Sequence, residues 1–309
     1  MLQSRRCISG ATHALALCAV LIAAPCLFAG GSHEVDVIRV ETFGAKLVRL
    51  ARPGMVADSW PIIYREDGQE SVRVVNVRYD PESDRSADLY YPPGVEPTAD
   101  KPRARGAEST RLPVLLFPMG LSAGRFAASE DSTPRDSATY LGFASLYANR
   151  GVVSVVYDAD DILAGIEAIL DFLLDHEDEL LLDSTRIGIW ATSGNGRLAS
   201  RVVARPDLVE SVRACVFIHA DANLTVVPPH AAYFIAYSRD GSNIERYSAT
   251  LARRVVARGL ESEQIDDVSY KNFFLSDGTT EACAVIERSA RFVEKHLVDP
   301  SPRKTQEDP

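Results

Sequence analysis

The sequence predicts an α/β fold with a mostly parallel central sheet that is covered by helices on both faces. From residue 113 onward, short apolar runs alternate with longer amphipathic runs, which is typical of buried parallel strands joined by helices. Residues 34–91 read instead as β-rich, with a rough alternation of apolar and polar residues at Ser71–Tyr79. A third observation is the run RIGIWATSGNGRLA at 186–199, in which an apolar strand enters a small-residue turn with Ser193 at its apex.

Composition narrows the class of protein. The chain has 309 residues, of which 46 % are hydrophobic, and this is enough for one large domain with a single core, predicted over 32–298. A net charge of −10 argues against nucleic acid or an anionic membrane surface as the main partner. The His and Cys residues show no zinc-like spacing, so we expect no metal and no cofactor. A small molecule is the expected partner.

The first residues have the pattern of an export signal. Arg5 and Arg6 form a basic segment, Ala14–Phe28 is apolar, and Ala29-Gly30-Gly31 offers small residues for cleavage. We therefore predict a signal peptide over 1–31 and a periplasmic or secreted mature protein. The alternative is an uncleaved membrane anchor, although the apolar stretch is short for a span.

Two of the 5 cysteines, Cys215 and Cys283, lie outside this leader. An exported compartment would permit a disulfide between them. Their expected places, mid-strand and on a late helix, favour two buried free thiols instead.

The amino-terminal part of the domain, residues 34–91, reads as β-rich. Ser71–Tyr79 roughly alternates apolar and polar residues, and Ala87–Tyr91 is a second strand that ends at Pro92-Pro93-Gly94. The polar stretch Gly94–Arg111 is expected to be an exposed loop.

The remaining elements alternate between strand and helix. Gly151 and Gly259 are expected to end two of the helices. The tail, Asp299–Pro309, is acidic and contains proline, so we expect disorder there. The predicted strands are Pro113–Phe117, Val152–Tyr157, Arg186–Ala191, Arg213–Ile218, Ala232–Tyr237 and a weak one near Ile265–Tyr270, and the predicted helices are Arg135–Arg150, Asp161–Asp178, Ser242–Arg258 and Thr280–Leu297.

A ligand site is expected at the carboxyl ends of the parallel strands. Ser193 is the candidate nucleophile, because a strand–turn–helix of this kind exposes a hydroxyl above a helix amino terminus. Gly194, together with Met119 or Gly120 in the loop after Pro113–Phe117, would supply backbone donors to an oxyanion. The other residues at this edge are Asp158, His219, Asp240 and Lys271.

Five segments in order resemble the dienelactone-hydrolase-like branch of the α/β-hydrolase superfamily, over about Val72–Leu297. They are ADLYYPPG, LPVLLFPMG, YANRGVVSVVYD, RIGIWATSGNG and FIAYSRDG. The resemblance implies Ser193 as nucleophile, Asp240 as the acid of the triad and an acyl-enzyme mechanism on esters, lactones or small amides. The sequence departs from the family at two places around the Ser193 turn, where Ala191 and Asn195 replace glycines. Asparagine tolerates unusual backbone angles.

The resemblance also implies a histidine shortly before the last helix, where this chain has Lys271. A free lysine has a pKa of about 10.4, so a neutral base costs about 4 kcal/mol, and a nearby Asp240 carboxylate favours the charged form instead. An ion pair between Lys271 and Asp240 is therefore one reading, and a Ser–Lys dyad is another. His219 is on the correct sheet edge to substitute as base.

Two functions stay open from the sequence. One is an exported serine hydrolase of carboxylic esters or lactones that is impaired, or that uses a substitute base. The other is a catalytically inactive relative that binds a small ligand or a protein partner. The Ser122–Pro134 insertion would be a lid in the first case and a contact surface in the second.

Overall fold

Nine strands form one sheet in the computed structural model, which describes residues 37–42, 72–80, 85–95, 97, 111–120, 133–239, 241–266 and 280–299. The strand order is β1-β2-β3-β5-β4-β6-β7-β8-β9. All described residues fall within one compact unit of the chain. The strands are β1 (Val37–Thr42), β2 (Arg73–Asp80), β3 (Arg85–Tyr91), β4 (Leu112–Leu116), β5 (Val153–Tyr157), β6 (Leu182–Ser193), β7 (Val212–Ala220), β8 (Ala232–Ala236) and β9 (Ser262–Ile265).

The sheet is antiparallel at one end and parallel elsewhere. Strands β1, β2, β3 and β5 pair antiparallel in succession, and every pairing from β5 to β9 is parallel. Every residue of β5 and β8 is buried, as their apolar sequences predict for strands covered on both faces. The predicted mostly parallel α/β sheet is therefore confirmed.

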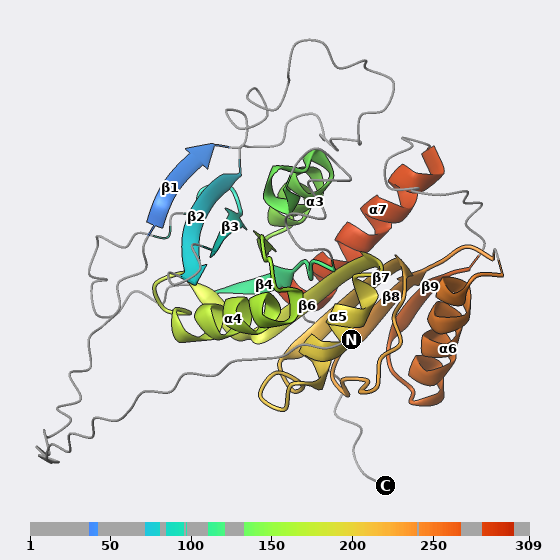
Figure 1. The fold of residues 1–309 in the computed structure, drawn as a ribbon. Helices are drawn as coiled ribbons and strands as arrows, with labels where there is room; N and C mark the ends of the chain where they lie inside the picture. The colour runs from blue at the N-terminus through green and yellow to red at the C-terminus, as the bar shows by residue number, and fades with distance from the viewer. Residues whose placement is uncertain are drawn as a thin grey trace, which may run out of the picture. The chain divides into compact units, whose positions relative to one another are not determined.

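Helices cover both faces of the sheet (Figure 1). Helices α3 and α7 contact each other on one face, and α4 and α5 contact each other on the opposite face, where α6 also packs. Helix α4 turns Gly165, Ile166, Ile169, Leu170 and Leu173 inward, and Asp161 caps it by accepting from the amides of Leu163 and Ala164. The helices are α3 (Ala138–Ala148), α4 (Ile162–Asp175), α5 (Gly196–Ala204), α6 (Asn243–Ala257) and α7 (Thr280–Val293), with a π-helical turn at Glu294–Val298.

The bounds of several predicted elements differ from the structure. The helix expected from Arg135 begins at Ala138, because Pro134–Asp136 forms a separate 3-10 turn. Strand β6 is longer than Arg186–Ala191, since it pairs with β4 from Leu182 and with β7 as far as Ser193. Near the weak strand expected at Ile265–Tyr270, the structure has a strand at Ser262–Ile265 that pairs with β8, and residues 267–270 lie outside the described residues.

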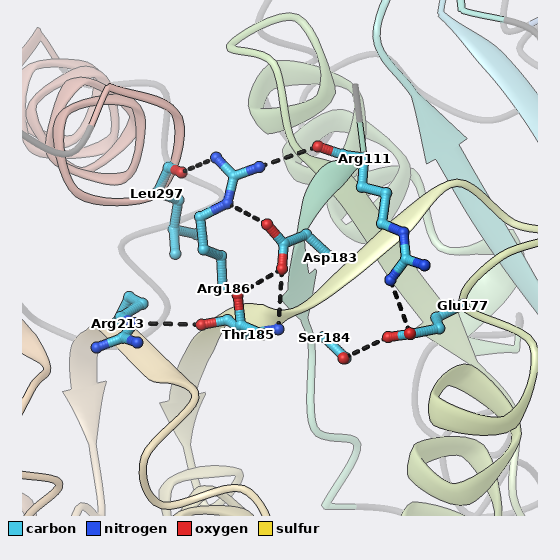
Figure 2. Close-up of polar contacts among 8 residues, drawn as sticks. All are labelled: Arg111, Glu177, Asp183, Ser184, Thr185, Arg186, Arg213 and Leu297. Carbon is cyan, nitrogen blue, oxygen red and sulfur yellow. Dashed lines mark hydrogen bonds and ion pairs between the residues drawn. The ribbon is translucent and has the colours of Figure 1, made fainter. Parts of the chain in front are cut away.

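A polar network fixes the amino end of β6 (Figure 2). The Arg186 guanidinium donates to the Asp183 carboxylate at 2.6 Å, to the Leu297 carbonyl at 3.0 Å and to the Arg111 carbonyl at 2.9 Å. Arg111 in turn donates to Glu177 at 2.7 Å. One side chain thus joins the segment before β4, the start of β6 and the end of the last helix.

Several predictions are tested only in part. Cys215 is a buried free thiol, and burial raises its pKa. The side chain of Cys283, the leader 1–31, most of the loop 94–111 and residues 300–309 lie outside the described residues. No helix in the part that is described has the length and apolar character to cross a membrane.

Candidate active site

Ser193 is the last residue of β6 and has a φ of +49°, in the left-handed region. This conformation is uncommon for a residue with a side chain and stores strain. Ser193 and Gly194 are both exposed, and the Asn195 amide closes the turn on the Thr192 carbonyl at 3.0 Å. The predicted strand–turn–helix is present, with two exposed residues, Ser193 and Gly194, at its turn.

Gly196 explains how α5 can start so close to the sheet. A Cβ atom at this position would lie 2.6 Å from both the carbonyl carbon and the oxygen of Asp221, which follows β7. The Asp221 amide also donates to the Ser193 carbonyl at 2.7 Å. The strained conformation of Ser193 is therefore held from both sides by the segment after β7 and the first turn of α5.

The loop after β4 lies beside this turn, as the sequence predicts. The Gly120 amide donates to the Asn195 side-chain oxygen at 2.8 Å, and the Met119 amide donates to the Tyr157 hydroxyl at 3.3 Å. Both candidate loop donors to an oxyanion are thus hydrogen-bonded to protein atoms. The Gly194 amide, in contrast, has no acceptor among the described residues.

His219 occupies an irregular point in β7 directly beside Ser193. Thr192 pairs with Ile218 but Ser193 pairs with Ala220, so His219 is the extra residue of a bulge. Its φ is +46°, and its Nδ1 lies 3.3 Å from the hydroxyl of Ser238, just beyond β8. Bulges re-aim side chains and are over-represented next to active sites. The structure therefore brings His219 to the end of the sheet between Ser193 and the segment after β8.

Two predicted site residues are not available for comparison, because Asp240 and Lys271 lie outside the described residues. Gly241, next to Asp240, has a φ of +75° and donates its amide to Glu245 at 2.5 Å. Most of the Ser122–Pro134 insertion is likewise outside the described residues.

The other described histidines have partners away from Ser193. His176 contacts the Phe172 carbonyl at 3.1 Å, His230 pairs with Glu210 at 2.8 Å, and His296 lies 3.5 Å from Glu261. His219 is therefore the imidazole that the described part of the chain offers at the carboxyl end of the sheet.

Asp158, after β5, belongs to a partly buried ionic cluster on the same edge. Its carboxylate accepts from the Arg135 amide at 3.3 Å and lies 3.7 Å from the Arg135 guanidinium, which also pairs with the buried Asp88 at 3.1 Å. Burial is the largest influence and raises the pKa of Asp158 to about 6. In the sheet order, β4 lies between β5, which Asp158 follows, and β6, which ends at Ser193.

Sequence reasoning missed two groups at the site. Asp221 is 6 % exposed, pairs with Arg197, and has one buried carboxylate oxygen without a partner in the described part. Tyr140 accepts from the Asn195 side-chain amide at 3.0 Å. Asp221 follows a predicted strand, so its place on the edge could have been inferred, whereas nothing local marks Tyr140. Across the described ranges, no group of three or more His, Cys, Asp or Glu could hold a metal ion.

Comparison with solved structures places this geometry in a known fold. Carboxyl esterase 2 from Tuber melanosporum is similar with a TM-score of 0.52 and 14 % identity, over 82 % of this chain and 97 % of that one. Esterase LipW from Mycobacterium marinum has a TM-score of 0.50 and 14 % identity, over 72 % and 81 %. The chain has the α/β-hydrolase fold.

A third α/β-hydrolase neighbour is esterase 2 from Thermogutta terrifontis, phosphoramylated by tabun, with a TM-score of 0.50 and 16 % identity over 74 % of this chain and 95 % of that one. No protein-family model matches the sequence, and no curated protein matches it.

Proposed function

We propose that the protein is an exported serine hydrolase that cleaves carboxylic esters or lactones through an acyl-enzyme at Ser193. The observation that carries the proposal is the elbow itself: an exposed serine with a φ of +49° at the carboxyl end of β6, followed by the exposed Gly194 amide. A strained serine presented above a helix amino terminus is the arrangement that nucleophilic catalysis needs.

The reaction would proceed in two steps, acylation of Ser193 and hydrolysis of the acyl-enzyme. The Ser193 oxygen attacks the ester carbonyl carbon, its proton passes to a base, and the carbonyl electron pair moves onto the oxygen facing the Gly194 amide. The tetrahedral species then collapses and the bond to the alcohol oxygen breaks, while that oxygen takes the proton from the base. Water repeats the sequence on the acyl-enzyme and releases the acid.

The general base that takes the proton from Ser193 is the group that would limit activity. Lys271 in the expected histidine slot would be cationic beside Asp240, which keeps it from accepting a proton near neutral pH. His219 is the substitute that we favour, because the bulge in β7 brings it beside Ser193 and the Ser238 hydroxyl contacts its Nδ1. With Nδ1 engaged in that contact, Nε2 would be the nitrogen that accepts the proton.

A second function, a catalytically inactive protein that binds a small ligand or a partner, has one specific observation in its favour. The amides of both Met119 and Gly120 are already hydrogen-bonded within the protein, which leaves Gly194 as the remaining one of the three candidate backbone donors for an oxyanion. A hydrolase lacking part of its machinery retains about 10³–10⁴-fold acceleration over water from binding and the remaining donors.

A fluorophosphonate probe on the purified protein separates the two functions. We expect an adduct on Ser193, located by peptide mass spectrometry, that disappears in Ser193→Ala. Labelling of His219→Ala should be at least 10-fold slower, and labelling of Lys271→Ala should not. A folded protein without an adduct on Ser193 would favour the binding function.

A further inference from the structure

We propose that Asn195 is a positioning residue that withholds the Gly120 amide from the oxyanion hole of the Ser193 site. The inference rests on the proposed function of Ser193. It concerns a contact between the elbow and the β4 loop, in which Asn195 is two residues after the candidate nucleophile and Gly120 is the last described residue of that loop.

The orientation of the Asn195 side chain is fixed at both ends. Its oxygen accepts from the Gly120 amide at 2.8 Å, and its nitrogen donates to the Tyr140 hydroxyl at 3.0 Å. A backbone amide can only donate, so the side-chain oxygen must face Gly120. Tyr140 is 8 % exposed, which keeps this end of the contact within the protein core.

The close approach also explains why position 120 is glycine. A Cβ atom there would lie 2.5 Å from the Asn195 side-chain oxygen. Asn195 itself has an ordinary helical backbone, with φ −63° and ψ −21°, so tolerance of unusual angles is not the reason for asparagine at this place. The side chain, rather than the backbone, is what the position uses.

This contact has a direct chemical consequence. At 2.8 Å the Gly120 amide makes a full hydrogen bond, which must break before that amide can donate to a developing oxyanion. Removing one oxyanion donor lowers kcat by about 10²–10³ in a serine hydrolase. An amide held on Asn195 is lost to the transition state in the same way, without any change in the nucleophile.

The test compares the wild type with Asn195→Ala and Asn195→Asp. Alanine fits the helical backbone and removes the acceptor, whereas aspartate keeps an acceptor oxygen of the same reach. Two quantities are measured on each folded protein: the second-order rate constant for fluorophosphonate labelling of Ser193, and the hydrogen-exchange protection of the Gly120 amide by nuclear magnetic resonance.

We expect Asn195→Ala to lose Gly120 protection and to label at least 10-fold faster, while Asn195→Asp retains protection and labels no faster than the wild type. A purely structural role for Asn195 cannot raise the rate. If the wild type labels but Asn195→Ala labels equally or more slowly, the inference is wrong and the proposed function stands. If none of the three labels, both are overturned.

Discussion

Asp158 is a residue whose position after β5 predicted its place on the functional edge but not its environment. It is near Arg135 and the buried Asp88, and burial raises its pKa from 3.8 to about 6. The folded protein therefore holds a proton on Asp158 that the unfolded chain has already released between pH 3.8 and about 6. Stability from this group is full below that window and is lost as pH rises through it.

In the wild type, the free energy of unfolding should fall by at most about 3 kcal/mol as Asp158 titrates across this window. We expect this fall to be absent in Asp158→Asn. The measurement is urea denaturation of the wild type and the variant from pH 3.5 to 8, with the difference between them plotted against pH. Asp160→Asn, at an exposed neighbouring carboxyl, controls for the loss of one charge. A difference that stays constant with pH would contradict the assignment.

Among the site residues, some positions could be predicted from the sequence and others could not. Ser193 could be predicted because its turn is encoded by consecutive small residues. The contact between Gly120 and Asn195 could not, because it joins positions 75 residues apart and depends on how close β4 and β6 bring their loops. The aim of His219 depends on a one-residue slip in pairing between β6 and β7, which leaves the apolar pattern of both strands unchanged.

At the scale of elements, the contact of α5 with the end of β7 depends on Gly196. Its added Cβ would meet backbone atoms of Asp221, which cannot move aside as a flexible side chain can. We expect Gly196→Ala to lower the free energy of unfolding by about 1–3 kcal/mol and to slow labelling of Ser193, because α5 must shift.

Gly194→Ala is the matched variant for stability, since a Cβ atom there meets nothing within 4 Å. Thermal denaturation followed by circular dichroism gives the comparison, at about 2–4 °C per kcal/mol for a domain of this size. Equal melting temperatures for the two variants would show that α5 accommodates the extra carbon.

Arg186 joins three elements at the amino end of β6. Because its guanidinium donates to three acceptors, its removal should lower the free energy of unfolding substantially. Arg186→Ala leaves the carbonyls of Arg111 and Leu297 without this donor, so we expect a loss of about 2–3 kcal/mol in urea denaturation. Arg213→Ala removes a single bond to the Thr185 carbonyl at 3.2 Å and should cost less than 1 kcal/mol. A larger loss for Arg213→Ala would refute this ranking.

Element types were predictable because wholly apolar runs and amphipathic runs differ in period. Their ends were less so. Strand β6 gained residues at both ends from pairing with β4 and β7, and β9 begins at Ser262, before its weak pattern indicated, where it pairs with β8. The helix predicted from Arg135 begins at Ala138, because Arg135 and Asp136 belong to the 3-10 turn that starts at Pro134.

At the scale of the whole molecule, a stabilising polar network and the candidate nucleophile lie at opposite ends of β6. The Arg186 network is at the amino end of β6, and Ser193 with His219 is at the carboxyl end. Parallel strands in sequence β4, β6, β7 and β8 deliver their following residues to that same end. Changes to Asn195 or His219 should therefore alter reactivity with little effect on the polar network.

The first 31 residues have the pattern of an export signal, which affects the whole chain. The basic residues Arg5 and Arg6, the apolar Ala14–Phe28 and the small residues at 29–31 predict export with removal of about the first 31 residues. Expression of the full chain in a bacterial host, followed by fractionation and intact-mass analysis, should give a soluble exported form that begins between residues 29 and 32. A full-length form recovered with the membranes would establish the anchor instead. Arg5→Glu with Arg6→Glu should abolish export in the first case, because it reverses the charge that precedes the apolar segment.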